Sequence, residues 1–222
     1  MSDSAEIAAR RYRKAVSQGW ADGCCVDEIR FLSFDAETTS LDPRRADMVA
    51  LGGIAIARGE IEISDSIELL VRQRYNSSAV TVHGITREES MAGVEIRDAL
   101  AATLRYFGNA VLVGHHVGFD IALLDTACMR EFDLQIGNRA IDTAELALLL
   151  AQEGVLPEME SFSLDSLLRI FGIEPHDRHT AAGDAFLTAL AFQRLLRVAR
   201  NAGRVTLAQL LEKPAISAEA ST

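Results

Sequence analysis

Three strand-like segments follow one another between residues 29 and 71, and their order restricts the possible folds. Residues 29–37 (IRFLSFDAE) are apolar and aromatic, residues 48–57 form a long apolar run, and residues 61–71 alternate between apolar and polar side chains. Arg58-Gly59-Glu60 suits a tight hairpin between the last two segments. The pattern therefore predicts a three-stranded meander.

The rest of the chain shows mostly helical periodicity. Apolar residues recur at near-helical spacing over residues 96–107 and 117–128, and the short apolar segment 109–114 between them is typical of a buried strand. We predict further helices over residues 142–151, 163–171, 181–202 and 206–211. Three strands followed by helices, with at least one more strand among them, indicate an α/β or α+β sheet with mixed strand directions.

A chain of 222 residues fits one α/β domain with elaborations. We expect an N-terminal helical extension over residues 1–27, a main domain over residues 28–204, and a short helix with a disordered tail over residues 205–222. The extension carries a basic cluster, formed by Arg10, Arg11, Arg13 and Lys14. A solvated helix face and a surface for a protein or nucleic acid partner both agree with this cluster.

Composition narrows the class of protein further. Hydrophobic residues make up 49% of the chain, yet no apolar run reaches the roughly 18 residues of a membrane span. The first ten residues lack the apolar segment of a secretory signal, so we expect a cytoplasmic protein. The cysteines Cys24, Cys25 and Cys128 form neither a disulfide framework nor a zinc-binding pattern, and we expect reduced thiols.

The formal net charge is −10, whereas proteins that hold nucleic acid tightly by its backbone are usually basic. The charge argues against an unassisted, non-specific binder of high affinity. It does not argue against an enzyme that holds one strand end through metal ions. Four arginines, Arg194, Arg197, Arg200 and Arg204, suit either a phosphate track or an ordinary solvated helix end.

Two acids, Asp35 and Glu37, stand at the end of the first predicted strand. Side chains two apart in a strand share one face, so these carboxylates lie side by side. Two like charges there are costly unless a cation neutralises them. The alternative is that both acids begin a loop.

Two further acids precede or begin predicted helices. Asp120 follows a short strand in the sequence VGHHVGFD, where an acid that only stabilises the helix dipole is the alternative. Asp184 lies in an apolar helix, where an acid is expensive unless it is paired or binds metal. His179 precedes it by five residues, and a capping or surface role is its alternative. Asp142 is better explained as a helix cap than as a ligand.

Four acids delivered by three elements fit a site for two divalent cations. Oxygen ligands of this kind suit Mg²⁺ or Mn²⁺. Two such ions about 4 Å apart can clamp the attacking and leaving oxygens of a phosphodiester, and a nearby histidine can accept a proton from the attacking water. The sequence therefore predicts metal-assisted phosphodiester hydrolysis.

Four motifs in this order make the chain similar to the DnaQ-like, or DEDDh, 3′→5′ exonucleases, and most closely to the proofreading epsilon-subunit branch of DNA polymerase III. FDAETT at residues 34–39 resembles the first family motif, and VGHHVGFD at residues 113–120 the second. HTAAGD at residues 179–184 resembles the third, and HGIT at residues 83–86 resembles the family's turn of that sequence.

The resemblance implies a ribonuclease-H-like fold with a five-stranded mixed β-sheet flanked by helices, and release of 5′-mononucleotides from single-stranded DNA or RNA. It implies that Asp35, Glu37, Asp120 and Asp184 bind two Mg²⁺ or Mn²⁺ ions, with His179 as general base. A histidine rather than a tyrosine at this last position favours the histidine subtype. Implied substrate-binding residues are Ala36, Thr38, His83, His115 and Phe119, of which Phe119 also suits the core.

Two departures from the family pattern lie beside the predicted site. Ser40 stands where the family usually has glycine, and His116 stands where it usually has asparagine. Neither removes a ligand or the base, although both could alter the fit of the substrate. A non-catalytic interaction module on the same fold, and an exoribonuclease of short RNA, are the alternative functions. The expected partners are nucleic acid 3′ ends and, through the N-terminal helix, another protein.

Overall fold

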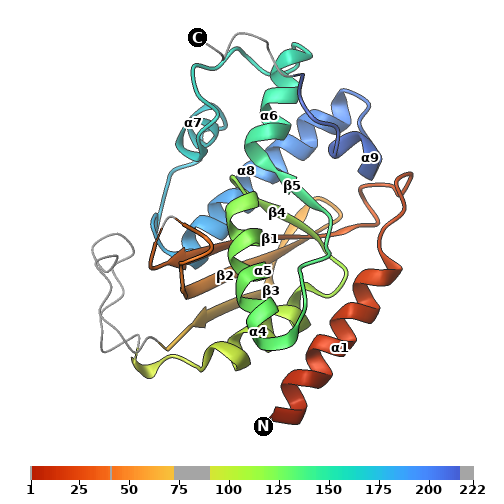
Figure 1. Cartoon of the computed structure of the whole chain (residues 1–222). Coiled ribbons are helices and arrows are strands. Elements are labelled where there is room, and N and C mark those ends of the chain that lie inside the picture. The colour runs from red at the N-terminus through yellow and green to blue at the C-terminus, as the bar shows by residue number, and fades with distance from the viewer. Residues whose placement is uncertain (1, 41, 73–90, 216–222) are drawn as a thin grey trace.

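A mixed five-stranded sheet forms the centre of the computed structural model, which describes residues 2–40, 42–72 and 91–215. The strand order is β3-β2-β1-β4-β5 (Figure 1). The strands are β1 (Arg30–Thr38), β2 (Met48–Ala57), β3 (Glu60–Leu70), β4 (Val111–Gly114) and β5 (Ala140–Asp142). The first three form the predicted antiparallel meander, and β4 and β5 add parallel strands beside β1.

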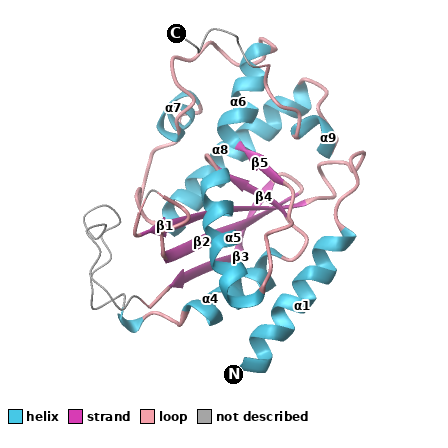
Figure 2. Cartoon of the chain, viewed as in Figure 1, coloured by secondary structure: helices cyan, strands magenta, loops and turns pink. Residues whose placement is uncertain are grey.

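Helices cover both faces of this sheet (Figure 2). One face carries α1 (Ser2–Gln18), α4 (Ile96–Phe107) and α5 (Gly118–Phe132). The other carries α6 (Thr143–Gln152), α7 (Leu164–Ile170), α8 (Ala181–Asn201) and α9 (Leu207–Leu210). Each set of helices encloses its own hydrophobic core, so the sheet separates two cores and is buried on both sides.

Strand β1 contributes alternate side chains to the two cores. The Phe31 ring lies 5.1 Å from that of Phe192 on α8, whereas the Phe34 ring lies 5.0 Å from that of Phe107 on α4. Because side chains two apart share a face, Asp35 continues the row of Phe31 and faces the side of α8. The hydrophobic alternation of this strand therefore fixes the direction of its terminal acids.

The first turn of α8 lies directly against the sheet. Gly52 on β2 is the partner of Asp35 in the β1–β2 ladder, and a Cβ atom at Gly52 would come within 2.4 Å of the backbone of Ala181. The buried Ser33 hydroxyl donates a hydrogen bond of 2.8 Å to the carbonyl of Ala185. A glycine and a small polar side chain thus allow the start of α8 to approach the end of β1.

The N-terminal helix α1 packs along α4. It buries Ala5, Ala8, Ala9 and Tyr12 in the core on that face. The Tyr12 hydroxyl donates a hydrogen bond to Asn138, and the Arg13 guanidinium donates one of 2.7 Å to the carbonyl of Phe132 at the end of α5. The apolar face of α1 is therefore covered within this chain, while Arg10, Arg11 and Lys14 are exposed.

Most predicted elements agree with the structure to within a few residues, with some exceptions. Strand β5 was not predicted individually, because three residues carry too little periodicity to stand out. Of the four arginines that suit either a phosphate track or an ordinary helix end, Arg200 pairs with Asp27, and Arg204 pairs with Glu153 and Glu212, which supports an ordinary structural role for these two. Among the described helices, none is long and apolar enough to cross a membrane. The predicted tail beyond residue 215 lies outside the described residues.

Candidate active site

Three carboxylates meet where β1 ends against α8. Asp35 and Glu37 come from β1, and Asp184 comes from the first turn of α8. One oxygen from each lies within 4.8 Å of the others, which is close enough for a shared metal ion. The structure thus brings together acids from two segments that lie far apart in the sequence.

Asp120 approaches this cluster from the other side of β1. It lies in the first turn of α5 and is 6% exposed. Its carboxylate accepts hydrogen bonds from the backbone N–H groups of Ala36 and of Asp120 itself, and its charge raises the pKa of Asp35. Although Asp120 is not one of the three acids whose oxygens converge, it lies close enough to act on the nearest of them electrostatically.

Crowding and burial keep these acids from ionising easily. Burial raises the pKa of Asp35 well above its usual value, and the charges of Asp120, Asp184 and Glu37 raise it further. Burial, followed by the charge of Asp184, raises the pKa of Glu37 to about 7. Burial also raises the pKa of Asp120 to about 7. The cluster holds more negative charge than its surroundings neutralise, which is the condition that a bound cation relieves.

The turn before α8 holds His179 beside Asp184. The His179 backbone N–H donates to an Asp184 oxygen at 3.3 Å, and the side chain of His179 is exposed. Thr180 caps α8 by accepting from Gly183 N–H at 3.1 Å. A Cβ atom at Gly183 would come within 2.0 Å of the Asp177 carbonyl, so this tight turn requires glycine there. His179 itself has a positive φ of 65°, an uncommon backbone conformation for a residue with a side chain.

The remaining predicted substrate residues have diverse surroundings. Thr38 is half-buried at the end of β1 and its hydroxyl donates to the Ser40 carbonyl at 2.8 Å. Phe119 is half-buried beside Asp120 and is not part of either hydrophobic core. His83, together with the whole HGIT segment, lies outside the described residues.

His115 is half-buried between β4 and α5 in the sequence. Its Nδ1 is 2.9 Å from the Thr143 hydroxyl, and its buried Nε2 has no hydrogen-bond partner among the described residues. Burial, followed by the charge of His116, lowers the pKa of His115 to about 4. Asp142 accepts hydrogen bonds from Ala144 N–H at 2.9 Å and Val117 N–H at 3.1 Å, which confirms its predicted role as a cap.

Arg178 is the functional candidate that the sequence did not reveal. Its guanidinium donates to Asp184 and, at 3.0 Å, to Asp165 in the first turn of α7. Its positive charge lowers the pKa values of Asp35 and Glu37. The position of Arg178 next to His179 was the only sequence signal, and an arginine in a loop is too common to be informative alone.

These residues fit divalent cations. The donors are carboxylate oxygens, which Mg²⁺ and Mn²⁺ prefer. Three of them converge within 4.8 Å, and burial together with neighbouring negative charges raises the pKa values of Asp35 and Glu37, as expected of acids that a cation would stabilise in the charged form. The acidic cluster is therefore compatible with metal binding.

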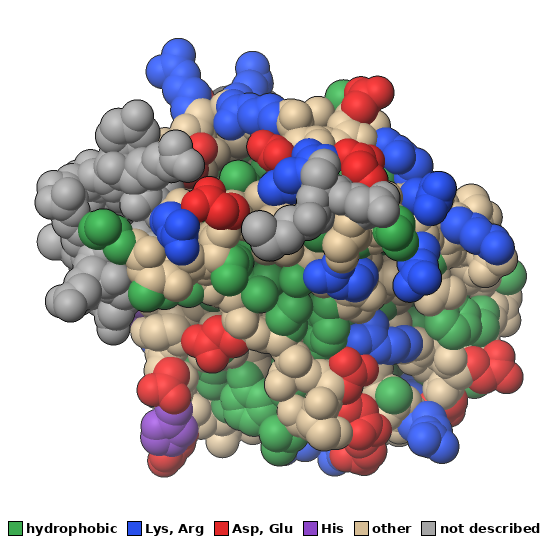
Figure 3. Space-filling model, turned by 90° about the horizontal axis from the view of Figure 1, so that it is seen from below, with side chains coloured by type: hydrophobic (Ala, Val, Ile, Leu, Met, Phe, Trp, Pro, Cys, Tyr) green, Lys and Arg blue, Asp and Glu red, His purple; other side chains and the backbone are tan. Residues whose placement is uncertain are grey.

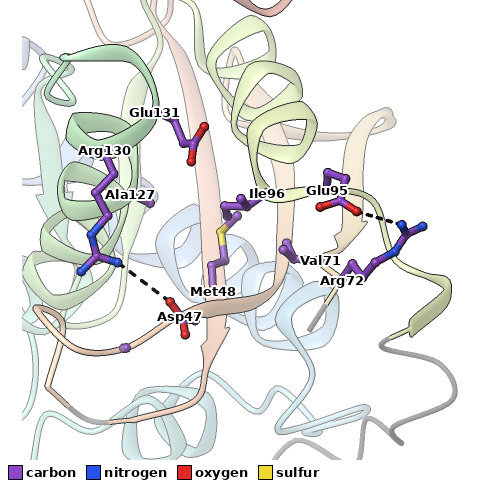
Figure 4. Close-up of a pocket in the computed structure, with 10 residues that line it drawn as sticks. Asp47, Met48, Val71, Arg72, Glu95, Ile96, Ala127, Arg130 and Glu131 are labelled. Carbon is purple, nitrogen blue, oxygen red and sulfur yellow. Dashed lines mark hydrogen bonds and ion pairs between the residues drawn. The ribbon is translucent and has the colours of Figure 1, made fainter. Parts of the chain in front are cut away.

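A separate pocket of about 280 Å³ opens between α4, α5 and the start of β2. Figure 4 shows the Arg130–Asp47 ion pair on one side of Met48 and the Arg72–Glu95 pair on the other. None of the four clustered acids lines this pocket. The molecular face in Figure 3 shows basic, acidic and apolar side chains interspersed, without one continuous basic field.

Comparison with known proteins places this geometry in a family. The family model RNase_T, described as Exonuclease, matches residues 32–192. A "DNA polymerase III subunit epsilon-like protein" of Rhodobacter capsulatus is 32% identical over 84% of this chain and 26% of its own length. A "DNA polymerase III PolC-type" protein of Thermotoga petrophila is 29% identical over 83% of this chain and 13% of its own length.

Solved structures share the fold. Exonuclease I of E. coli in complex with a dT13 oligonucleotide superimposes with a TM-score of 0.67 at 22% identity, over 79% of this chain and 43% of that one. The chain thus spans about a quarter or less of the curated relatives named above and less than half of exonuclease I. Because the family model covers most of the chain, the protein belongs to the DnaQ-like exonuclease family of nucleases, and it has the predicted ribonuclease-H-like α/β fold.

Proposed function

We propose that this nuclease is a metal-dependent 3′→5′ exonuclease that releases 5′-mononucleotides from single-stranded DNA or RNA ends in the cytoplasm. The observation that carries the proposal is the convergence of Asp35, Glu37 and Asp184 at the end of β1, with Asp120 beside them and His179 in the adjoining turn. This arrangement supplies metal ligands and a base for hydrolysis at one place.

Asp35, Glu37, Asp120 and Asp184 would hold two Mg²⁺ or Mn²⁺ ions. When bound, such ions stabilise the negative charge that develops on the phosphate and lower the pKa of a coordinated water. The protein's own contribution is to fix the carboxylates on rigid elements. Strand β1 and the first turns of α5 and α8 provide these elements.

His179 would accept the proton of the attacking water. Its backbone N–H contacts Asp184, so the residue is anchored beside the ligands, whereas its exposed ring can reach a substrate that arrives from solvent. Histidine suits this task because its ordinary pKa lies close to neutral pH.

A strand end would enter beside the carboxylates. The half-buried Phe119 ring adjoins Asp120 and offers a surface on which a base can stack. We assign the backbone of Ala36 and the side chains of Thr38 and His115 to the surroundings of the terminal nucleotide, while the role of His83 remains a prediction from the family motif alone. The relatives named for DNA polymerase III and the exonuclease I complex with dT13 support a nucleic acid substrate. The net charge of −10 favours recognition of an end over tight binding along the backbone.

We assign the nuclease activity to residues 28–204. We assign contact with a protein partner to the extension over residues 1–27. The exposed basic side chains Arg10, Arg11 and Lys14 on α1 are available for a protein partner. Since the apolar side of α1 is covered by α4, such a partner would meet the polar face of this helix.

Digestion of matched DNA and RNA oligonucleotides tests the proposal directly. Strands labelled at the 5′ end should shorten stepwise from the 3′ end in Mg²⁺ or Mn²⁺, and a 3′-phosphate should block digestion. EDTA should abolish the reaction, and added metal should restore it. Shortening from the 5′ end would refute the proposed direction, full activity in chelator would refute metal dependence, and complete inactivity on all strands would favour a non-catalytic module.

A further inference from the structure

Arg178 makes contact with both the candidate metal site and a neighbouring helix. Its side chain is 23% exposed and lies in the turn before α8. One guanidinium nitrogen donates to Asp184, and its Nε donates to Asp165 on α7 at 3.0 Å. The Asp184 side chain is 13% exposed and that of Asp165 is 61% exposed, so one partner is enclosed and the other faces water.

Both oxygens of Asp184 are already engaged in this arrangement. Arg178 donates to Oδ1, and the His179 backbone N–H donates to Oδ2 at 3.3 Å. A carboxylate oxygen has a second lone pair, so hydrogen bonding alone does not exclude a metal ion. A guanidinium and a divalent cation nevertheless repel each other and share the same negative charge, so each weakens the hold of the other on Asp184.

The surrounding charges make this competition important. Arg178 contributes positive charge beside both Asp35 and Glu37, whereas Asp184 contributes negative charge beside both. Without a metal ion, the cluster therefore relies on Arg178 for neutralisation. With a metal ion bound, the same guanidinium adds repulsion.

We propose that Arg178 is an exchangeable counter-ion of the metal site, which holds Asp184 in the metal-free protein and is drawn away to Asp165 when metal binds. This inference rests on the proposed metal dependence. Arg178 then lowers the affinity of the site for metal, and Asp165 raises it by offering the guanidinium another partner. Arg178 is a positioning residue, since it acts through Asp184.

Metal binding to the full-length chain tests the inference, with isothermal titration of Mn²⁺ into metal-free protein. Arg178→Gln should tighten Mn²⁺ binding by about tenfold or more, because one repelling charge close to the ion is gone. Asp165→Asn should weaken binding several-fold, because Arg178 keeps only Asp184 as a partner. In the double variant, the effect of Asp165→Asn should vanish, since there is no arginine to draw away.

Two further variants make the outcome specific. Arg169→Gln removes an exposed arginine from α7 and should leave Mn²⁺ affinity unchanged, which controls for overall charge. Thermal melting without metal should show Arg178→Gln below wild type, because the acids have lost their cation. If Arg178→Gln does not fold, Arg178→Lys decides the question. Lysine keeps the charge but loses the fork that joins two carboxylates, so the inference requires a Mn²⁺ affinity no higher than that of wild type, and tighter binding would overturn it.

The results separate this inference from the proposed function. Unchanged or weaker Mn²⁺ binding in Arg178→Gln would overturn the inference, as would an Asp165→Asn effect that persists in the double variant. An increase in KM for the oligonucleotide with unchanged metal affinity would show that Arg178 contacts substrate instead. If wild-type protein binds no metal and its nuclease activity resists chelator, the proposed metal dependence itself has failed.

Discussion

A charged side chain is buried at each end of helix α8, but the charges that surround it differ between the two ends. Asp184 in the first turn is 9% exposed, and Arg204 just beyond the last turn is 8% exposed. Arg204 pairs with Glu153 and with Glu212, the latter at 2.9 Å. Asp184 pairs with Arg178 and shares its surroundings with Asp35 and Glu37.

The pKa values of the neighbouring acids record this difference. Hydrogen bonding by Arg204 lowers the pKa of Glu153, as expected of an acid in a satisfied pair. Burial and like charges raise the pKa of Asp35 at the other end. A buried charge with matched partners stabilises structure, whereas a buried charge in an unbalanced cluster favours a ligand of opposite sign. The comparison therefore favours the proposed functional role for the first end of α8 and a structural role for the last.

The largest expected effect comes from removing the charge at the functional end. Asp184→Asn should reduce nuclease turnover by more than the roughly 10²–10⁴-fold that loss of a general base costs, because a metal ligand is lost. It should also weaken Mn²⁺ binding. The metal-free melting temperature should not fall, since one of several crowded like charges is gone. A drop of about 10 °C without metal would instead identify Asp184 as a structural acid.

His179 provides the next largest effect and separates base from ligand. His179→Ala should reduce turnover by about 10²–10⁴-fold while Mn²⁺ affinity remains near wild type. Steady-state kinetics and metal titration on the same preparation measure both. His176→Ala is the matched control. His176 is also exposed, but its Nε2 lies 3.6 Å from a Glu174 oxygen, and neither residue belongs to the cluster of Asp35, Glu37 and Asp184. Near-wild-type turnover in His179→Ala would leave the general base unassigned.

At the structural end, the effect should appear in stability and not in chemistry. Arg204→Ala removes a largely buried side chain and its pairs with two partly exposed acids, which should lower the free energy of unfolding by about 1–2 kcal/mol. Activity per folded molecule should stay near wild type. Urea unfolding and turnover at low temperature measure the two quantities. A loss of turnover as large as that of His179→Ala would erase the distinction between the two ends.

The smallest effect is a pH dependence of stability without metal. Glu37 and Asp120 have a folded-state pKa of about 7, above their ordinary values of 4.5 and 3.8. Raised pKa values mean that the folded state binds protons more tightly than the unfolded state. The contribution of these two acids to the free energy of unfolding is therefore full below about pH 4 and is lost as pH rises towards 7. The metal-free melting temperature should therefore fall by several degrees between these limits, and saturating Mg²⁺ should reduce the fall. A metal-free melting temperature that rises with pH throughout this range would contradict the raised pKa values.

Much of the fold could be anticipated because its signals are local. The strand β1 begins with a buried apolar and aromatic run, and the shared face of Asp35 and Glu37 follows from the strand period of two. The bounds of α8 follow from a cap at Thr180 and a glycine stop at Gly203. The family motifs then connected these segments to one site. The sequence did not predict strand β5, because its three residues gain their strand conformation by pairing with β4.

The sequence by itself determined the elements, the residue types of the site and the family. Only the tertiary structure decided how charge is balanced, because partners far apart in sequence neutralise one another according to where the chain folds. Nothing local predicts that Arg204 meets Glu153, or that Arg178 reaches both Asp184 and Asp165. The sequence also does not predict that the missing side chain of Gly52 allows the start of α8 to pack against the sheet beside Asp35. Electrostatic energy depends on distance and burial, and both are properties of the folded chain.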